Sequence, residues 1–600
     1  MARIKLTYAL SLILFAGLVN TANAQFFEVR LNNGLSYTYG NEELKRIEFL
    51  EGDPDNNKDN PGDTDITNIE KELRDAIPLM IAYRKPDGGW EPHYYQYQRA
   101  NNIDNYAGYW SVTKKTFAFG GPLDPLYSYP NDYLGGPLDN SVFTMAKNAI
   151  FYAEELGKPE WRAIALIIQA YVGHEIVDFY GGCPFNDWRN VNRVPPNHWQ
   201  AGDEVYDIIF EDLTEAVQIL NERQPSADEL QKIEDANCTL SQGDYRYWVK
   251  FANSIRLRMA MNIVKYDPEK AKKEAEQAVA DGVFDETDAR DMGYYFEQTN
   301  TTHSLYKICH SWNDLRLGAS LENIMKHLKH PLFTKMFGTS GFTITDKFTG
   351  IAAPGDIYGI RPSVAMDNVT GVDKGYGPFG TLSLMYLPHT FFKRAEALFL
   401  RAEGALRGWN MGGSAQEFYE KGIRQHFLDV AYCLAAQGIE NTTPEELGYE
   451  EYINGTAMKG QILDYVDPRN AENNMAGRVS IDVKWNESED NELKLEKIIT
   501  QKYIANFPMS AEAWTTFRRT GYPRLFPPKL NNLNGVDSEL QIRRMPMNET
   551  TNNMDELNTL NAVLGGDQKN GGLRVFWDLP TEGRGEMGEN GCLMIVPKNF

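Results

Sequence analysis

The chain is short of cysteine and of positive charge, and each shortage excludes a class of protein. Its 600 residues hold 60 Lys and Arg against 83 Asp and Glu, a formal net charge of -23 at pH 7. Because phosphate groups are bound by basic surfaces, this composition argues against nucleic acid or an anionic membrane as partner. The cysteines are odd in number and far apart, which predicts buried thiols rather than a disulfide framework or a metal site: Cys183, Cys238, Cys309, Cys433 and Cys592.

Motifs of common catalytic and nucleotide sites are also missing. The sequence has no GxSxG, no Walker loop and no HExxH. Gly375–Gly380, GYGPFG, has GxGxxG spacing, but it contains a proline and lacks a flanking strand and helix. His327 and His330 have no third ligand, so we interpret them as a solvated pair at a helix end. We therefore expect no active site, no metal and no cofactor.

The N-terminus has the order of a secretory signal. Residues 1–24, MARIKLTYALSLILFAGLVNTANA, carry Arg3 and Lys5, then an apolar run, then an Ala-Asn-Ala cleavage site. The run is too short to span a bilayer, and no later segment offers the roughly 18 continuous apolar residues that spanning needs. We expect an exported protein without a membrane helix.

Two small segments precede the main domain. Residues 25–50 alternate apolar and polar around Asn33-Gly34, which predicts a β-hairpin. Residues 51–68 are predicted to be an acidic linker rich in Asp, Asn and Pro. The alternating Asp and Asn resemble a calcium loop, but Lys58 stands where that loop needs glycine and no Glu closes it. Plain linker is the favoured interpretation.

Residues 69–600 are predicted to form one mainly α domain. Apolar residues recur at helical spacing in pairs of segments of about 34 residues, which predicts irregular tetratricopeptide-like hairpins. The long segments between the helices are rich in Gly, Pro and aromatics, and loops of that length are usually functional. The expected helices cover 140–156, 161–179, 204–220, 247–264, 268–280, 391–408, 415–427, 495–507 and 511–519.

Aromatic residues gather in polar loops. The segment 88–110, GGWEPHYYQYQRANNIDNYAGYW, interleaves rings with amides and carboxylates. This mixture suits carbohydrate, because a ring face covers sugar C–H groups while amides and carboxylates take the hydroxyls. The same mixture also occurs where loops simply pack on a helical scaffold.

Several blocks of the sequence carry specific motifs, among them WRAIALIIQAYVGHEIVDFYGGCPFND (161–187), with its DxYGxxP turn, and SAEAWTTFRRTGYPRL (510–525). In sequence and in order these blocks resemble the SusD/RagB family of outer-membrane nutrient-binding proteins, in particular its second SusD-like branch. Tyr503 replaces the usual tryptophan, and Met547 lies near the place of a usual tyrosine. The other blocks are 204–220, 246–264, 391–427, 495–508 and Arg543-Arg544 with Glu549 and Asn552.

The resemblance implies a SusD-like α/α superhelix of four tetratricopeptide-like units below a loop-rich ligand face. It also implies a partner, a SusC-type TonB-dependent β-barrel transporter, and an oligosaccharide or peptide ligand, with no bond chemistry. The hallmark residues are expected to be structural, with the arginines capping carbonyls or bonding carboxylates such as those of Glu396 and Glu403. They are Arg518, Arg519, Gly521, Tyr522 and Pro523.

Family members are normally anchored through a cysteine just after the signal. This chain has Gln25 there and reaches its first cysteine only at Cys183, so a lipid anchor is not indicated. We expect the outer membrane and cell surface, with the periplasm or the medium as alternatives.

The ligand residues cannot be carried over from the family one by one, so we choose them by chemistry from the loops 90–110, 303–316 and 375–386. The expected stacking residues are Trp90, Tyr94, Trp110, Trp312 and Tyr376, with Asn101 and Asp104 as hydroxyl partners. Two other functions stay open. One is a peptide- or protein-binding tetratricopeptide-like module; the other, a helical glycoside hydrolase, rests only on the abundance of carboxylates.

Overall fold

The fold is mainly helical, as predicted. A computed structural model describes residues 26–30, 36–40, 66–81, 92–114, 141–191, 197–234, 240–295, 303–338, 356–364, 376–377, 386–439, 442–456, 458–468, 470–547, 554–580, 583–588 and 593–600. The predicted signal peptide, residues 51–65 of the predicted linker, Trp90, Cys238 and Cys592 lie outside these ranges. Helix α1 begins at Ile66, three residues before the predicted start of the helical domain.

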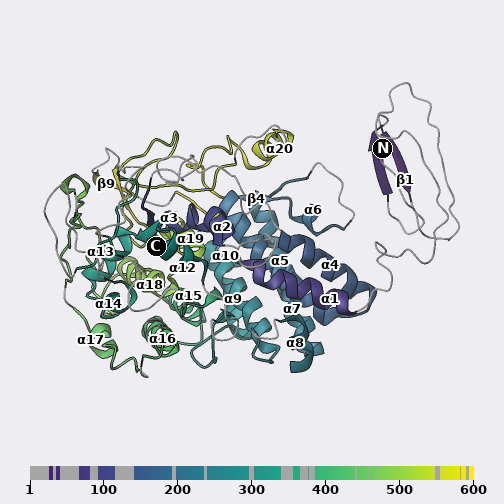
Figure 1. The fold of residues 1–600 in the computed structure, drawn as a ribbon, viewed down its shortest axis with the longest axis horizontal. Coiled ribbons are helices and arrows are strands. Elements are labelled where there is room, and N and C mark those ends of the chain that lie inside the picture. Colours follow the sequence, from purple (N-terminus) through teal and green to yellow (C-terminus); the bar gives the residue numbers. More distant parts are fainter. Residues whose placement is uncertain are drawn as a thin grey trace.

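The first half of the scaffold is a row of packed helices. α1 (Ile66–Ala76) packs on α4 (Ser141–Glu155), which packs on α5 (Pro159–Tyr180). Figure 1 shows α5 beside α7 (Gly202–Arg223), and α7 in turn contacts α9. The row closes with the antiparallel pair α9 (Arg246–Asn262) and α10 (Pro268–Asp281). All five helices predicted in this part exist, with ends within three residues of those expected.

The second half is built around α15 (Arg394–Leu406), which contacts α16 (Ala415–Ala436), α18 (Asn491–Asn506) and also α9. α15 thus joins the two halves into one core. The sequence predicted a helix from residue 391, but β8 (His389–Phe392) precedes it. α16 runs nine residues beyond its predicted end, because buried Val430 and Leu434 continue its apolar spacing. α19 (Ser510–Thr520) follows α18.

Short elements complete the fold. The described residues contain five two-stranded sheets, all antiparallel: β1–β2 (Phe26–Arg30, Ser36–Gly40), β3–β7 (Trp110–Val112, Leu315–Leu317), β4–β5 (Gly182–Cys183, Gln200–Ala201), β6–β8 (β6 Met292–Tyr294) and β9–β10 (Gly583–Met587, Leu593–Val596). The β1–β2 pair confirms the predicted hairpin. The remaining helical segments are η1 (Ile77–Met80), α2 (Pro92–Tyr95), η2 (Gln96–Ala100), α3 (Ile103–Tyr106), α6 (Phe185–Arg189), α8 (Ala227–Ile233), α12 (Ser304–Tyr306), η3 (Lys307–Ser311), α13 (Ala319–His327), α14 (Phe333–Met336), α17 (Tyr449–Ile453), η5 (Ala471–Asn473) and α20 (Met554–Leu564).

α5 is the central helix of the core. It is long and apolar enough to cross a membrane, but its apolar window is entirely buried among other helices, which is the environment of a core helix. It ends at Gly181, whose φ of 86° closes the helix in the left-handed region that glycine adopts without strain. The DxYGxxP turn is therefore a helix terminus that leads into β4.

The interpretation of His327 and His330 as solvated residues is wrong. Both are buried, because the helix end that carries them is covered by the segment around Ile481 and by α16 and α17. His327 Nε2 donates to the Ile481 carbonyl at 2.9 Å, and the His330 ring stacks on Phe427. The cysteines that the structure describes, Cys183, Cys309 and Cys433, are buried, as predicted.

Candidate ligand-binding site

Three loops that the sequence nominated for ligand binding meet around one small sheet. β3 pairs with β7 so that Trp110 lies opposite Leu317, which joins the 90–110 loop to the 303–316 loop. The third loop joins through Gly377, whose carbonyl accepts from the Leu317 amide at 3.3 Å. The Gly377 amide donates to the Tyr358 carbonyl at 2.6 Å. Segments separated by some 270 residues of sequence therefore meet around this sheet.

Asp314 fixes the first two loops to each other. Its carboxylate accepts from Gln96 Nε2 at 2.7 Å and from Lys114 Nζ at 2.6 Å. Lys114 Nζ also donates to the Trp312 carbonyl at 3.3 Å. The Trp312 turn is therefore held by side chains of the neighbouring loop, and Asn313 in this turn has a φ of 55°.

The scaffold supports this region from below. The Tyr503 hydroxyl of α18 donates to the Ala107 carbonyl at 2.9 Å, and α3 contacts α19. Both loops also contain a π-helical turn, η2 and η3. Such turns are rare and occur often at functional sites, because they alter which way successive side chains point.

Half-buried and exposed rings lie on the contacting elements α2, α12 and η3. Tyr94 and Trp312, two of the expected stacking residues, are half-buried, with the His93 ring centroid 4.7 Å from that of Tyr94. Tyr306 and His310, 5.0 Å apart by ring centroids, were missed by the sequence reasoning, although they lie in a nominated loop. Burial and the nearby Arg316 lower the pKa of His310, so its ring is uncharged at neutral pH. We call His93, Tyr94, Tyr306, His310 and Trp312 the ring face.

Four expected ligand residues lie inside the protein instead, which corrects our expectation of exposed groups. Trp110 is 1% exposed and packs against Phe507, with ring centroids 5.4 Å apart. Tyr376 is 2% exposed, and its hydroxyl lies 3.0 Å from a carboxylate oxygen of Asp467. Asn101 and Asp104 are 0% and 1% exposed, and burial raises the pKa of Asp104 to about 6. These four residues lie within the nominated loops, but they offer no surface to a ligand in this structure.

The arginine-rich segment at the end of α19 belongs to the core. Arg519 forms two 2.7 Å ion-pair contacts with the Glu403 carboxylate, the bidentate pairing that the sequence predicted. Arg518 caps carbonyls, donating to Asp178 O at 2.6 Å and to Arg543 O at 2.9 Å. Its guanidinium also lies 3.6 Å from the centre of the Trp514 ring. Both guanidinium groups are therefore bonded to the protein itself.

Other members of the hallmark segment have structural contacts as well. Glu396 pairs with Arg258, at 2.7 and 3.0 Å, rather than with the Arg518–Arg519 pair. Gly521 ends α19 with a φ of 76°, and a Cβ there would lie 2.9 Å from Pro597. Tyr522 is buried and Pro523 follows it. Burial raises the pKa of Glu403, but the Arg519 and Arg407 cations outweigh burial and hold this pKa well below its ordinary value.

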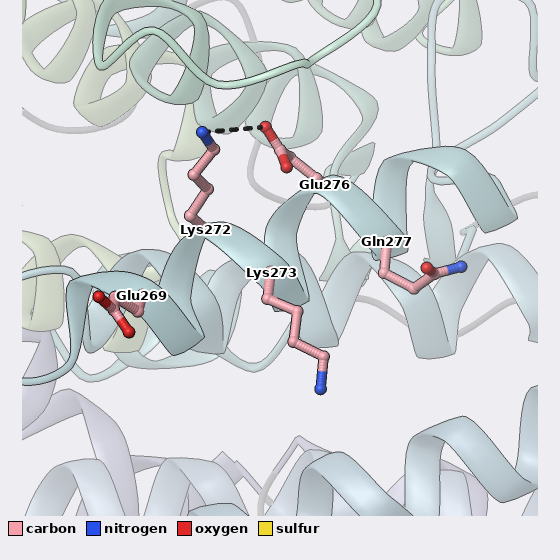
Figure 2. A pocket seen from close by; sticks show the side chains of 5 residues that line it. All are labelled: Glu269, Lys272, Lys273, Glu276 and Gln277. Atoms are coloured by element: carbon pink, nitrogen blue, oxygen red, sulfur yellow. Dashed lines mark ion pairs between the residues drawn. The ribbon is translucent and has the colours of Figure 1, made fainter.

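A shallow hollow along α10 carries no sign of a ligand site. Figure 2 shows its five polar side chains, of which Lys272 and Glu276 point toward each other at 3.9 Å while Lys273 points away. It has no ring and no buried charge, so it is a solvated helix face. Among the residues that the structure describes, no group of His, Cys, Asp or Glu could hold a metal ion.

Comparison with known proteins finds one matching family and several similar solved structures. Residues 50–578 match the family described as SusD-like, Susd and RagB outer membrane lipoprotein. No curated protein sequence matches. A chitin-binding SusD homolog from Flavobacterium johnsoniae is 30% identical, with a TM-score of 0.69 over 85% of this chain and 99% of that one.

Two further solved structures are similar over the same extent. A SusD homolog from Bacteroides thetaiotaomicron is 26% identical, with a TM-score of 0.67 over 85% of this chain and 98% of that one. One from Bacteroides uniformis is 25% identical, with a TM-score of 0.68 over 86% of this chain and 100% of that one. The similarity covers most of this chain and nearly all of each of the other chains.

Proposed function

The chain belongs to the SusD-like family of outer-membrane nutrient-binding proteins, and from this premise we propose that it captures an oligosaccharide on the ring face. It then delivers this ligand to a SusC-type TonB-dependent β-barrel transporter. Family membership supports the transporter partner and a place at the outer membrane.

The observation that carries the proposed ligand is the ring face itself. Tyr94 and Trp312 present aromatic surface on loops that Asp314 ties together, beside the half-buried ammonium of Lys114. Ring faces bind sugar C–H groups, and adjacent donors take hydroxyls. A shallow surface of this kind binds weakly and releases readily, as delivery to a transporter requires.

Binding without hydrolysis fits the chemistry of the described part of the site. One buried carboxylate of this region, Asp314, accepts from both Gln96 and Lys114. A glycosidase needs two carboxyl groups facing the scissile bond, one of them able to give a proton. Asp314 instead has the role of joining two loops.

The first ligands to test are chitin oligosaccharides, because one similar protein is described as chitin-binding. Isothermal titration of the whole chain with these and with a panel of other glycans measures the affinity. Trp312→Ala is the test variant, and Trp409→Ala is the matched control, since Trp409 is also half-buried but lies between α15 and α16. Loss of glycan affinity in the first variant alone supports the proposal. Equal affinity in both removes the ring face as the site.

The partner is tested separately, by purifying the protein from detergent-solubilised outer membranes. A co-purifying β-barrel transporter supports delivery, while recovery of the chain alone from the periplasm or medium contradicts it. If glycans fail and peptides bind without dependence on Trp312, the alternative of a peptide-binding helical module replaces the present proposal.

A further inference from the structure

A second hollow, distinct from the one along α10, lies beside Phe507. It has a volume of about 250 Å³ and is walled by the segment 286–295, the segment 387–394 and one side of α16. We call it the α16 pocket. Phe507 lines it and also packs against Tyr109 and Trp110, so one ring contacts both this pocket and the loop 90–110.

Most charged groups around the α16 pocket are engaged by groups of the protein. Arg394 bonds both carboxylates of the wall, Asp291 at 2.9 Å and Asp429 at 3.1 Å. Lys393 donates to the carbonyls of Ala505 and Phe507, both at 2.7 Å. Glu286 at the rim pairs with Lys421 at 2.8 Å. An ion would have to disrupt these pairs, so the pocket favours an uncharged ligand.

One stripe of α16 carries hydrogen-bonding atoms that the protein leaves unused. Within the described residues, Gln425 Oε1, Asp429 Oδ2 and the Tyr432 hydroxyl have no hydrogen-bond partner. Their spacing of four and three residues places them on one face of the helix. A buried polar atom without a partner costs about 1–3 kcal/mol, so three together on a pocket wall indicate a missing partner.

The unused atoms define what that partner must offer. Burial and the neighbouring Asp291 raise the pKa of Asp429 to about 6, so at neutral pH this group is mostly a carboxylate, an acceptor. With the Gln425 carbonyl it requires a ligand that carries donors. Asp429 Oδ1 already accepts from Gln425 Nε2 at 2.8 Å and from Arg394 at 3.1 Å, so the unused acceptor of this group is Oδ2. The three unused atoms are shielded in this structure, and a ligand in the pocket reaches them only after their side chains rotate.

We propose that the α16 pocket binds one uncharged polyol ring, the size of a single sugar residue. Its hydroxyls donate to Gln425 and Asp429 and bond the Tyr432 hydroxyl, while its C–H face rests on Leu387 and Pro388. This site goes beyond the proposed capture of an oligosaccharide on the ring face, because it is a separate pocket and takes a single ring.

The Tyr432 ring also completes the wall. The rings of Tyr295 and Tyr432 meet edge to face with centroids 5.4 Å apart, and the Arg290 guanidinium lies 4.8 and 5.6 Å from those centroids. Tyr432→Phe therefore keeps this stacking and removes only the hydroxyl. Ala289, an exposed residue at the rim, allows the opposite change, since Ala289→Phe adds bulk to the pocket without removing a polar contact.

The experiment titrates the whole chain with glucose and with N-acetylglucosamine, followed by saturation-transfer NMR at probe concentrations of about 10 mM, which detect a millimolar site. We expect at least one probe to bind. Tyr432→Phe should weaken it about three- to tenfold, the worth of one hydrogen bond. Ala289→Phe should abolish it, whereas Ala435→Phe, at an exposed alanine near the end of α16, should leave it unchanged.

Three results overturn the inference: neither probe binds, binding survives both pocket variants, or binding disappears in Trp312→Ala while Ala289→Phe leaves it intact. The last result would assign the probe to the ring face. Conversely, probe binding that depends on Ala289 and Tyr432 in a chain that binds no oligosaccharide supports the pocket while the proposed function fails.

Discussion

The arginine cluster at the end of α19 and the ring face look alike in the sequence and differ in the structure. Both are dense groups of residues that commonly bind ligands. Arg518 and Arg519 are buried and bonded to protein carbonyls and to Glu403, whereas Tyr94 and Trp312 are half-buried on short turns. In this strongly acidic chain the two arginines bond to internal carbonyls and to a carboxylate. The rings on the loops are therefore the candidate ligand-binding groups.

The largest expected effect is on the residue of the loop 90–110 that lies in the core rather than on the ring face. Trp110→Ala should destabilise the protein by about 3–5 kcal/mol, because it empties a fully buried site against Phe507. Urea unfolding measures this loss, and the folded fraction should keep its glycan affinity. A stable variant with impaired affinity would instead place Trp110 among the ligand residues.

Breaking the arginine cluster should cost nearly as much. Arg519→Leu leaves Glu403 buried with only Arg407 beside it, which should lower the free energy of unfolding by about 3 kcal/mol. The control is Arg246→Leu, an exposed arginine paired with Asp244, whose removal should leave stability nearly unchanged because exposed ion pairs are screened by solvent. Unchanged stability with lost ligand binding in Arg519→Leu would make the cluster a ligand site.

The pH dependence of the free energy of unfolding tests whether His330 is buried. Burial lowers the pKa of His330 from 6.5 to about 3, so the unfolded state binds a proton first as the pH falls. The stability that His330 contributes is therefore full above pH 6.5 and decreases below it, by about 2 kcal/mol near pH 5.

His330→Phe should remove this part of the loss between pH 7 and pH 5, since a phenyl ring fits beside Phe427 and Tyr452. Urea unfolding at both pH values measures it. The exposed His198 provides the control, because His198→Gln should leave the pH dependence unchanged. An equal pH dependence in both variants would contradict the burial of His330.

The smallest effect belongs to the ring face. Trp312→Ala should reduce the affinity for the best-binding glycan by about 1 kcal/mol, the contribution of one aromatic contact. Its effect on stability should be much smaller than that of Trp110→Ala, because the Trp312 side chain is only partly buried. A stability loss as large as that of Trp110→Ala would place Trp312 in the core.

The helices were predictable because each buries an apolar stripe that its own sequence displays, as α7 and α10 do. Which rings face solvent was not predictable, because burial depends on partners distant in the chain. Trp110 is covered by Phe507, and Tyr376 is bonded to Asp467. Asp314, which joins two loops, had no local signal at all. The pairing of Arg519 with Glu403 was predictable from charge and family position, whereas that of Glu396 with Arg258 was not.

The most direct test of the contrast between core and ring face is the affinity of the double variant Tyr94→Ala/Trp312→Ala, measured by isothermal titration with the glycan that the unmodified chain binds best. Two lost aromatic contacts should weaken binding roughly 30-fold while the urea midpoint stays close to that of the unmodified protein. An unchanged affinity in this variant would contradict the assignment of ligand binding to the ring face.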